Sequence, residues 1–162
     1  MLESPDVGRV MAAVNSHRAR HHAPPLVENE ELRRYAEAWA VREASGDELK
    51  HSHGPYGENL AKARNKWNNA TEACLGAVTM WQDEEHAYDY TKPGFAKNTG
   101  HFTQQCWVAS RRVGFGVAKI PAGKWAGGWL VVASYDPPGN YVDKFRENVL
   151  RPTASPAMTH NS

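Results

Sequence analysis

Residues 100–107 read GHFTQQCW, and residues 135–140 read YDPPGN. In the first stretch a glycine precedes an imidazole, and either Asn98 or Thr99 can cap a helix that begins near His101. In the second stretch Pro-Pro-Gly forms a rigid turn that ends a strand. The two stretches therefore predict a short helix followed by a small sheet.

Helical periodicity dominates the chain before these stretches. Apolar residues at helical spacing predict a first helix from about residue 6 to residue 21, which Pro24-Pro25 stops. Asn29 can cap a second helix, and a third is predicted over about residues 71–85. The buried face of the third helix would carry Cys74, Val78 and Trp81.

The apolar period changes to two after Arg112. Bulky residues alternate there with Gly114, Gly116 and Ala118, so one face of the predicted strand is nearly bare. Another element is expected to pack closely against that face. Residues 129–135 predict the antiparallel return strand, and helices that precede a small antiparallel sheet indicate an α+β fold.

Composition indicates one globular domain, which we assign to residues 1–151, followed by a flexible tail at residues 152–162. Hydrophobic residues make up 41% of the chain, enough for a core without disulfides. The net charge of +1 and the lack of a long run of like charges argue against nucleic acid as a partner. No segment approaches the roughly 18 consecutive apolar residues that a membrane span needs.

The two cysteines, Cys74 and Cys106, allow at most one internal bridge. We favour two buried thiols that pack as small hydrophobic side chains over a disulfide. Asn69 begins a formal N-glycosylation motif, but a role in capping the third helix is favoured for it.

Eight histidines are spread along the chain, and we identify neither an HExxH motif nor a helical histidine pair that faces one way. His17, His21 and His22 come near the end of the first helix, where a cation interacts favourably with the helix dipole. A structural role is therefore favoured for these three. Residues 49–60 have turn residues between two histidines and a carboxylate, which predicts a loop that lines a cleft.

An ordered set of further motifs accompanies the two opening stretches. NSHR occupies residues 15–18, KHS residues 50–52 and GENLA residues 57–61, and Trp81 stands three positions before Glu84. In this order, over nearly its whole length, the chain resembles the CAP superfamily of cysteine-rich secretory proteins, antigen 5 proteins and pathogenesis-related class 1 proteins. The resemblance implies the CAP fold, an α-β-α sandwich with a small antiparallel sheet between helical layers.

The resemblance also implies a cleft whose two histidines and two glutamates correspond to His51, Glu58, Glu84 and His101. Neutral imidazoles of His51 and His101 can hold Zn²⁺, while the carboxylates orient the rings or bind the ion's water. Two ligands alone predict weak, reversible zinc binding, and no other cofactor is expected. Glu58 and Glu84 are also candidate catalytic residues of an open metal site. For Glu58, ordering the loop through backbone N–H groups is an equally weighted alternative.

Three functions are compatible with such a cleft. The first is a non-enzymatic module that binds lipid: a sterol, a fatty acid or membrane head groups. Tyr88, Tyr90 and Phe95 would form an apolar lip for it, although packing over the third helix is favoured for these rings. The second is a metal-dependent hydrolase or protease, and the third is a self-associating homodimer that acts in signalling or defence. The lack of a complete catalytic set favours binding.

Several positions depart from the secreted members of the superfamily. Phe115 and Ala133 replace cysteines of the sheet, so its customary disulfides are excluded. No signal peptide is recognised at the start, and with this pattern the chain resembles the Golgi-associated pathogenesis-related branch. The resemblance predicts a cytosolic or peripheral Golgi-membrane location. The alternative location is extracellular, if a signal peptide was removed. Leu2 stands where N-myristoylation needs a glycine. Gln105 and Cys106 replace the usual apolar pair before the tryptophan, and no function is assigned to them.

Overall fold

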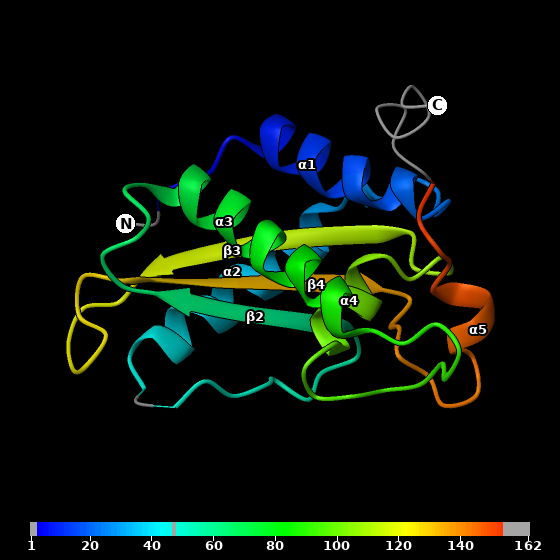
Figure 1. Ribbon diagram of the computed structural model, residues 1–162. Helices are drawn as coiled ribbons and strands as arrows, with labels where there is room; N and C mark the ends of the chain where they lie inside the picture. The colour runs from blue at the N-terminus through cyan, green and yellow to red at the C-terminus, as the bar shows by residue number, and fades with distance from the viewer. Residues whose placement is uncertain (1–2, 47, 154–162) are drawn as a thin grey trace, which may run out of the picture.

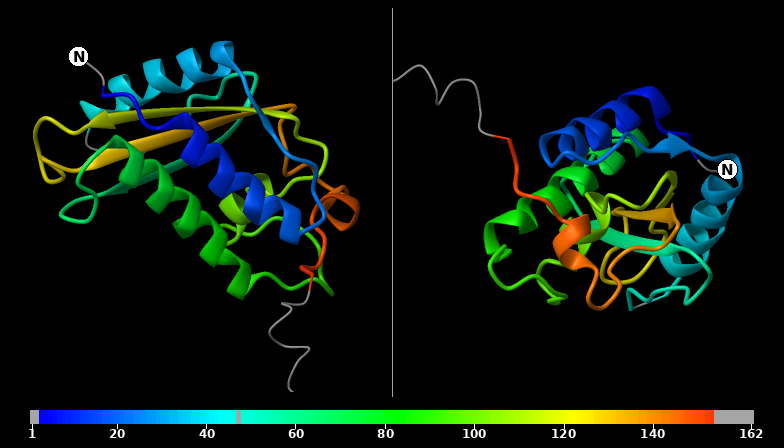
Figure 2. Two further views of the ribbon diagram at one scale, coloured as in Figure 1. Left: turned by 90° about the horizontal axis from the view of Figure 1, so that it is seen from above. Right: turned by 90° about the vertical axis from the view of Figure 1, so that its right-hand side faces the viewer.

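The computed structural model describes residues 3–46 and 48–153. A four-stranded sheet lies between two helical layers, with α1 and α3 on one face and α2 on the other (Figures 1 and 2). In chain order the elements are α1 (Val7–Arg20), β1 (Val27–Glu28), α2 (Glu30–Ala44), β2 (Gly57–Ala63), α3 (Ala70–Asp83), the 3₁₀ helix η1 (Glu84–Ala87), α4 (Gly100–Gln105), β3 (Arg112–Lys119), β4 (Trp129–Asp136) and α5 (Phe145–Asn148). This is the predicted α+β sandwich.

Side-chain caps fix the starts of the three long helices. The Asp6 carboxylate accepts a hydrogen bond from Arg9 N, and the Asn29 side chain accepts one from Leu32 N. Asn69 accepts from Glu72 N and so caps α3, which is the role favoured over glycosylation. The predicted third helix extended two residues too far, because the chain tightens into η1 after Asp83.

The strand order is β1-β3-β4-β2. Strands β3 and β4 are antiparallel, as predicted, and β2 pairs antiparallel with β4 on its other side. The short strand β1 pairs with β3 in parallel, so the sheet is mixed rather than wholly antiparallel. The prediction of a loop over residues 49–60 was wrong for its last part, since Gly57 begins β2.

Gly114 and Gly116 allow α2 to lie directly on β3. A Cβ atom at Gly114 would overlap the backbone of Leu32 and Arg33, and one at Gly116 would overlap that of Ala36. The expected close packing on the bare face of β3 is thus confirmed. Its bulky face packs under α1 and α3 in one core cluster, which contains Val10, Val14, Cys74, Val78, Trp81, Val113, Phe115 and Val117.

The core holds without a disulfide between the two cysteines. Cys74 and Cys106 are both buried and free, as favoured from the sequence. Phe115 and Ala133 face each other across β3 and β4 and are also buried. Of the predicted tail, residues from 154 onward lie outside the described part of the chain, while Thr153 N donates a hydrogen bond to Arg20 O at 2.8 Å.

Candidate functional site

Hydrogen bonds join residues 100–107 to residues 135–140. Thr103 Oγ1 donates to the Asn140 side-chain oxygen at 2.6 Å, and Asn140 Nδ2 donates to Gly100 O at 2.9 Å. The Gln104 side-chain oxygen accepts from Gly139 N at 2.8 Å. The turn after β4 therefore fixes α4, and with it His101, against the end of the sheet.

His51 and Glu58 form one of two histidine–glutamate pairs. His51 Nδ1 lies 2.9 Å from Glu58 Oε1, which also accepts a bond from Ser52 N at 2.8 Å. Ser52 Oγ donates to the second carboxylate oxygen at 2.7 Å. Glu58 is therefore placed both to orient the imidazole and to order the loop, so its two alternative roles coincide.

The Glu58 carboxylate is held in its ionised form. Burial alone would raise its pKa, but the hydrogen bonds from His51 and Ser52 outweigh burial, and the pKa is lowered below the ordinary value. A carboxylate with a lowered pKa and several donors is a weak base. This environment suits an orienting group better than a general base.

Glu84 and His101 form the second pair. His101 Nδ1 lies 2.7 Å from Glu84 Oε2, and the backbone N–H groups of His101 and Phe102 both donate to Oε1 at 3.0 Å. The carboxylate thus satisfies free amide groups in the first turn of α4 while it fixes the ring.

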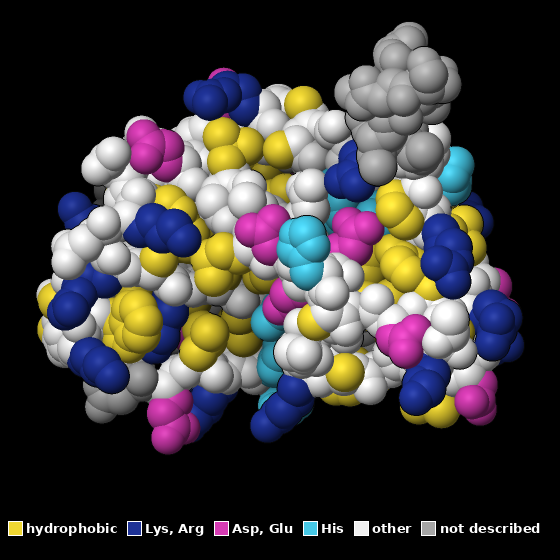
Figure 3. Space-filling model, viewed as in Figure 1, with side chains coloured by type: hydrophobic (Ala, Val, Ile, Leu, Met, Phe, Trp, Pro, Cys, Tyr) yellow, Lys and Arg dark blue, Asp and Glu magenta, His cyan; other side chains and the backbone are white. Residues whose placement is uncertain are grey.

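Shared contacts join the segments that carry the two pairs. Trp81 stacks on the His101 ring at a centroid distance of 6.1 Å and an angle of 16°, and its Nε1 donates to Leu60 O at 3.3 Å. Asn59, next to Glu58 in β2, donates to His101 O at 3.0 Å. On the face drawn in Figure 3, histidine and acidic side chains gather near the middle. The exposed fractions of the two imidazole side chains are 54% for His51 and 32% for His101.

This arrangement leaves one ring nitrogen of each histidine for a ligand. When a carboxylate accepts from Nδ1–H, the lone pair of a neutral imidazole lies on Nε2, which is the usual arrangement of metal-binding histidines. Each carboxylate oxygen of Glu58 and Glu84 already accepts a hydrogen bond. The four side chains do not bring three ligand atoms within 4.8 Å of one another, so any metal held here has few protein ligands.

A second histidine–glutamate cluster was missed by the sequence analysis. Within the described residues, His17, His21 and Glu85 bring their ligand atoms within 4.8 Å of one another, so they could hold a metal ion. His17 lies in α1, and His21, four residues later, is the C-cap residue of that helix. Their ring centroids are 4.9 Å apart, so the two side chains face the same way, contrary to our prediction that no helical pair does so. The i, i+4 spacing was the signal that could have identified the cluster.

Both of these histidines are buried, with exposed fractions of 2% and 0%. Burial, followed by the nearby charges of His21, Arg20 and Arg18, lowers the pKa of His17 to about 3. His17 is thus neutral, and the prediction that it meets the helix dipole as a cation was wrong. The dipole argument fails because other elements cover this end of α1.

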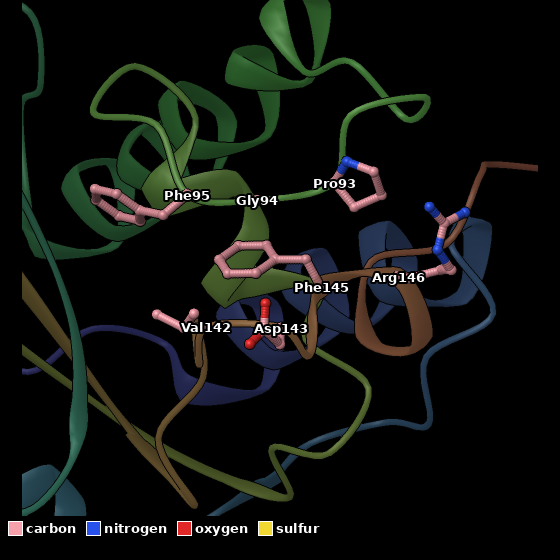
Figure 4. Close-up of a pocket in the computed structure, with 7 residues that line it drawn as sticks. All are labelled: Pro93, Gly94, Phe95, Val142, Asp143, Phe145 and Arg146. Carbon is pink, nitrogen blue, oxygen red and sulfur yellow. The ribbon is translucent and has the colours of Figure 1, made fainter.

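The three aromatic residues of the predicted lip divide into two groups. Tyr88 packs against Tyr90 and against Phe102 of α4 with ring centroids 4.9 and 5.5 Å apart, whereas packing over the third helix was favoured from the sequence. Phe95, in contrast, is 61% exposed. It lines an open pocket of about 330 Å³ together with Val142 and Phe145 (Figure 4).

Sequence comparison places this chain among known proteins. The model of the CAP family, described as the cysteine-rich secretory protein family, matches residues 11–135. Pathogenesis-related protein 1A1 of Solanum lycopersicum is 40% identical over 135 residues, which cover 81% of this chain and 71% of that protein. The Golgi-associated plant pathogenesis-related protein 1 of Homo sapiens is 36% identical over 149 residues, covering 88% and 91%.

Solved structures share the fold at low sequence identity. The crystal structure of NaASP2 with Zn²⁺ superposes with a TM-score of 0.68 and 18% identity, covering 94% of this chain and 88% of that one. The hookworm platelet inhibitor superposes with a TM-score of 0.70 and 16% identity, covering 100% and 86%. None of the helices in the described residues is long and apolar enough to cross a membrane.

Proposed function

The chain belongs to the CAP family of cysteine-rich secretory proteins, and we propose that it is a non-enzymatic binding protein whose ligand is a lipid. The observation that carries this proposal is the pocket beside Phe95. Two apolar side chains of its lining are exposed to water, which is unfavourable for apolar groups: Phe95 is 61% exposed and Val142 is 80% exposed. Exposed apolar groups around a pocket favour an apolar partner.

The build of the pocket suits an amphiphile. Phe95 comes from the loop after η1, Val142 from the loop after β4, and Phe145 from α5, as Figure 4 shows. Phe145 is only 2% exposed and forms an apolar floor. Asp143 and Arg146 supply one charge of each sign to the lining. A ligand with an apolar body and a hydroxyl or carboxyl end, such as a sterol or a fatty acid, would match both features.

Electrostatic attraction contributes little to this proposal. The chain has a net charge of +1, and the pocket contains opposite charges that offset each other. We therefore expect binding to depend on buried apolar area and to change little with salt. Weak peripheral association with a membrane would follow from insertion of Phe95 and Val142. A cytosolic or Golgi-membrane location is supported only by the similarity to the human Golgi-associated protein.

Besides lipid, we expect the protein to bind zinc reversibly through Nε2 of His51 and His101, the imidazoles of the two histidine–glutamate pairs. The similarity in fold to NaASP2, crystallised with Zn²⁺, supports this part of the proposal. A metal-dependent hydrolase is less well supported. Each carboxylate oxygen of Glu58 and Glu84 already accepts a hydrogen bond from the protein, which suits both side chains to orienting the imidazoles.

Ligand uptake tests the proposal. Purified protein would be titrated with a fluorescent sterol and a fluorescent fatty acid, and pelleted with neutral and acidic liposomes. Phe95→Ser and Val142→Ser should each weaken uptake by about tenfold, since each removes a large apolar contact. Val27→Ser is the matched control, because Val27 is 66% exposed on β1, outside the pocket. Equal uptake by all four proteins, or no uptake by the wild type, would contradict the proposal.

A further inference from the structure

The buried cluster of His17, His21 and Glu85 shares no residue with the lining of the lipid pocket or with the two histidine–glutamate pairs. His17 lies in the last turns of α1, His21 is the C-cap residue of that helix, and η1 supplies the carboxylate of Glu85. The Phe102 ring covers both imidazoles, with centroid distances of 5.8 Å to His17 and 5.2 Å to His21. The cluster is thus enclosed by protein rather than open to a substrate.

The hydrogen bonds of His21 place an acceptor nitrogen of its ring opposite a carboxylate oxygen of Glu85, which is also an acceptor. His21 Nδ1 lies 2.8 Å from Leu150 O, a carbonyl oxygen that can only accept, so Nδ1 carries a proton. The lone pair of the neutral ring is then on Nε2, which lies 3.1 Å from Glu85 Oε1. A lone pair and a carboxylate oxygen at this distance need a cation, either a proton on Nε2 or a metal ion bound by both atoms.

His17 supplies a second unsatisfied atom. Within the described residues, Nε2 of this buried side chain has no hydrogen-bond partner. Its Nδ1 lies 2.9 Å from the Gln105 side-chain amide, whose oxygen is also buried without a partner. The same amide nitrogen donates to Val78 O at 3.2 Å. Zinc binding by His17 Nε2 would require the amide to turn over and give up that hydrogen bond, so that its oxygen accepts from Nδ1–H and the lone pair of His17 lies on Nε2. Gln105, which had no role from the sequence, then becomes the residue that orients this ligand.

The donor set and spacing select a particular ion. Two imidazole nitrogens and one carboxylate oxygen are ligands typical of Zn²⁺, whereas Ca²⁺ and Mg²⁺ prefer oxygen alone. Zinc bonds of about 2.0 Å in a tetrahedron separate neighbouring ligand atoms by about 3.3 Å, and longer bonds separate them by more. The separation of 3.1 Å between His21 Nε2 and Glu85 Oε1 is close to that value.

We infer that His17, His21 and Glu85 form a second, buried Zn²⁺ site with a structural role. Through these ligands the ion joins α1 to η1. The hydrogen bond from His21 to Leu150 O extends the connection to the C-terminal segment. Tyr90 Oη, 3.5 Å from Glu85 Oε2, lies next to the carboxylate as an outer contact.

The experiment isolates this site from the cleft. A His51→Ala, His101→Ala double variant removes the exposed imidazoles, and after treatment with a chelator it would be titrated with Zn²⁺ against a coloured competitor. We expect one zinc per chain, a rise in Tm with added zinc, and, when cobalt replaces zinc, an intense visible spectrum of Co²⁺ held by the three side chains and one water molecule. Zinc bound by no more than a trace, with an unchanged Tm, would mean that a proton holds His21 and Glu85 together, and would overturn the inference.

Two further substitutions in this background assign the ligands. Glu85→Gln keeps the shape of a side chain that is 19% exposed, so the fold should survive, and it should lower the zinc affinity by more than about tenfold. His17→Leu should abolish the cobalt spectrum. Asp83→Asn is the matched control, since this exposed acid lies just before η1 and outside the cluster. Unchanged affinity in Glu85→Gln, with circular dichroism equal to that of its parent, would also overturn the inference.

Discussion

Glu84 holds His101 at two points: its Oε2 lies 2.7 Å from the ring Nδ1, and its Oε1 accepts the His101 backbone N–H at 3.0 Å. One side chain therefore caps α4 and sets the direction in which the imidazole presents Nε2. The orientation of the His101 ring and the stability of α4 are coupled through this carboxylate.

Replacing Glu84 by alanine tests that coupling. We expect the free energy of unfolding to fall by about 1–2 kcal/mol, because the helix start loses its acceptor, and zinc binding at the cleft to weaken as the ring is freed. Urea denaturation and zinc titration measure the two effects. Glu147→Ala, at an exposed position on α5, should change stability by less than about 0.5 kcal/mol. Equal stability of the two variants would show that Glu84 does not cap α4.

The glycines of β3 predict a steric effect. Gly116→Ala should lower the free energy of unfolding by about 1–3 kcal/mol or prevent folding, because the added methyl group overlaps the backbone of Ala36 in α2. Gly94→Ala is the control, since a Cβ there meets nothing within 4 Å. Thermal melts of both variants give the comparison, and a Gly116→Ala protein as stable as the wild type would contradict the close packing of α2 on β3.

Both thiols should be inert in the folded protein. Burial raises the pKa of Cys74 to about 12 and also raises that of Cys106, so neither forms the reactive thiolate near neutral pH. A thiol reagent such as DTNB should label neither cysteine until urea unfolds the chain, and should then label both. Rapid labelling of one cysteine under native conditions would place that thiol at the surface.

Lowering the pH should remove the contribution of the Glu58 carboxylate to the stability of the folded protein. Because its pKa is lowered in the folded state, the ionised carboxylate stabilises the protein above its ordinary value of 4.5, and this stabilisation is lost as the pH falls through the folded-state pKa. The difference in unfolding free energy between wild type and Glu58→Gln should therefore shrink as the pH is lowered from neutral. A difference that stays constant over the same range would mean that the charge of Glu58 contributes nothing.

Local rules in the sequence predicted most of the architecture. Asn29 and Asn69 cap helices because a short polar side chain precedes an apolar helical repeat, and Gly114 and Gly116 marked the face on which α2 lies. Strand β2 was missed because its sequence, GENLAKA, contains no β-branched or aromatic residue. Its pairing with β4 is a tertiary effect that the local sequence does not carry.

The site was predicted less completely. The resemblance to CAP proteins identified all four residues of the two pairs, and hydrogen bonds now join His51 to Glu58 and His101 to Glu84. The His17 cluster was missed because its carboxylate lies far away in the sequence, and because the histidines near the end of α1 were assigned to the helix dipole.

The most direct test of lipid binding is a nuclear magnetic resonance titration of ¹⁵N-labelled protein with a sterol. The proposal predicts saturable shifts centred on residues 93–95 and 142–146, where the two loops and α5 surround the pocket. Shifts centred instead on His51 and His101, or no shift at concentrations that saturate the lipid assay, would contradict it.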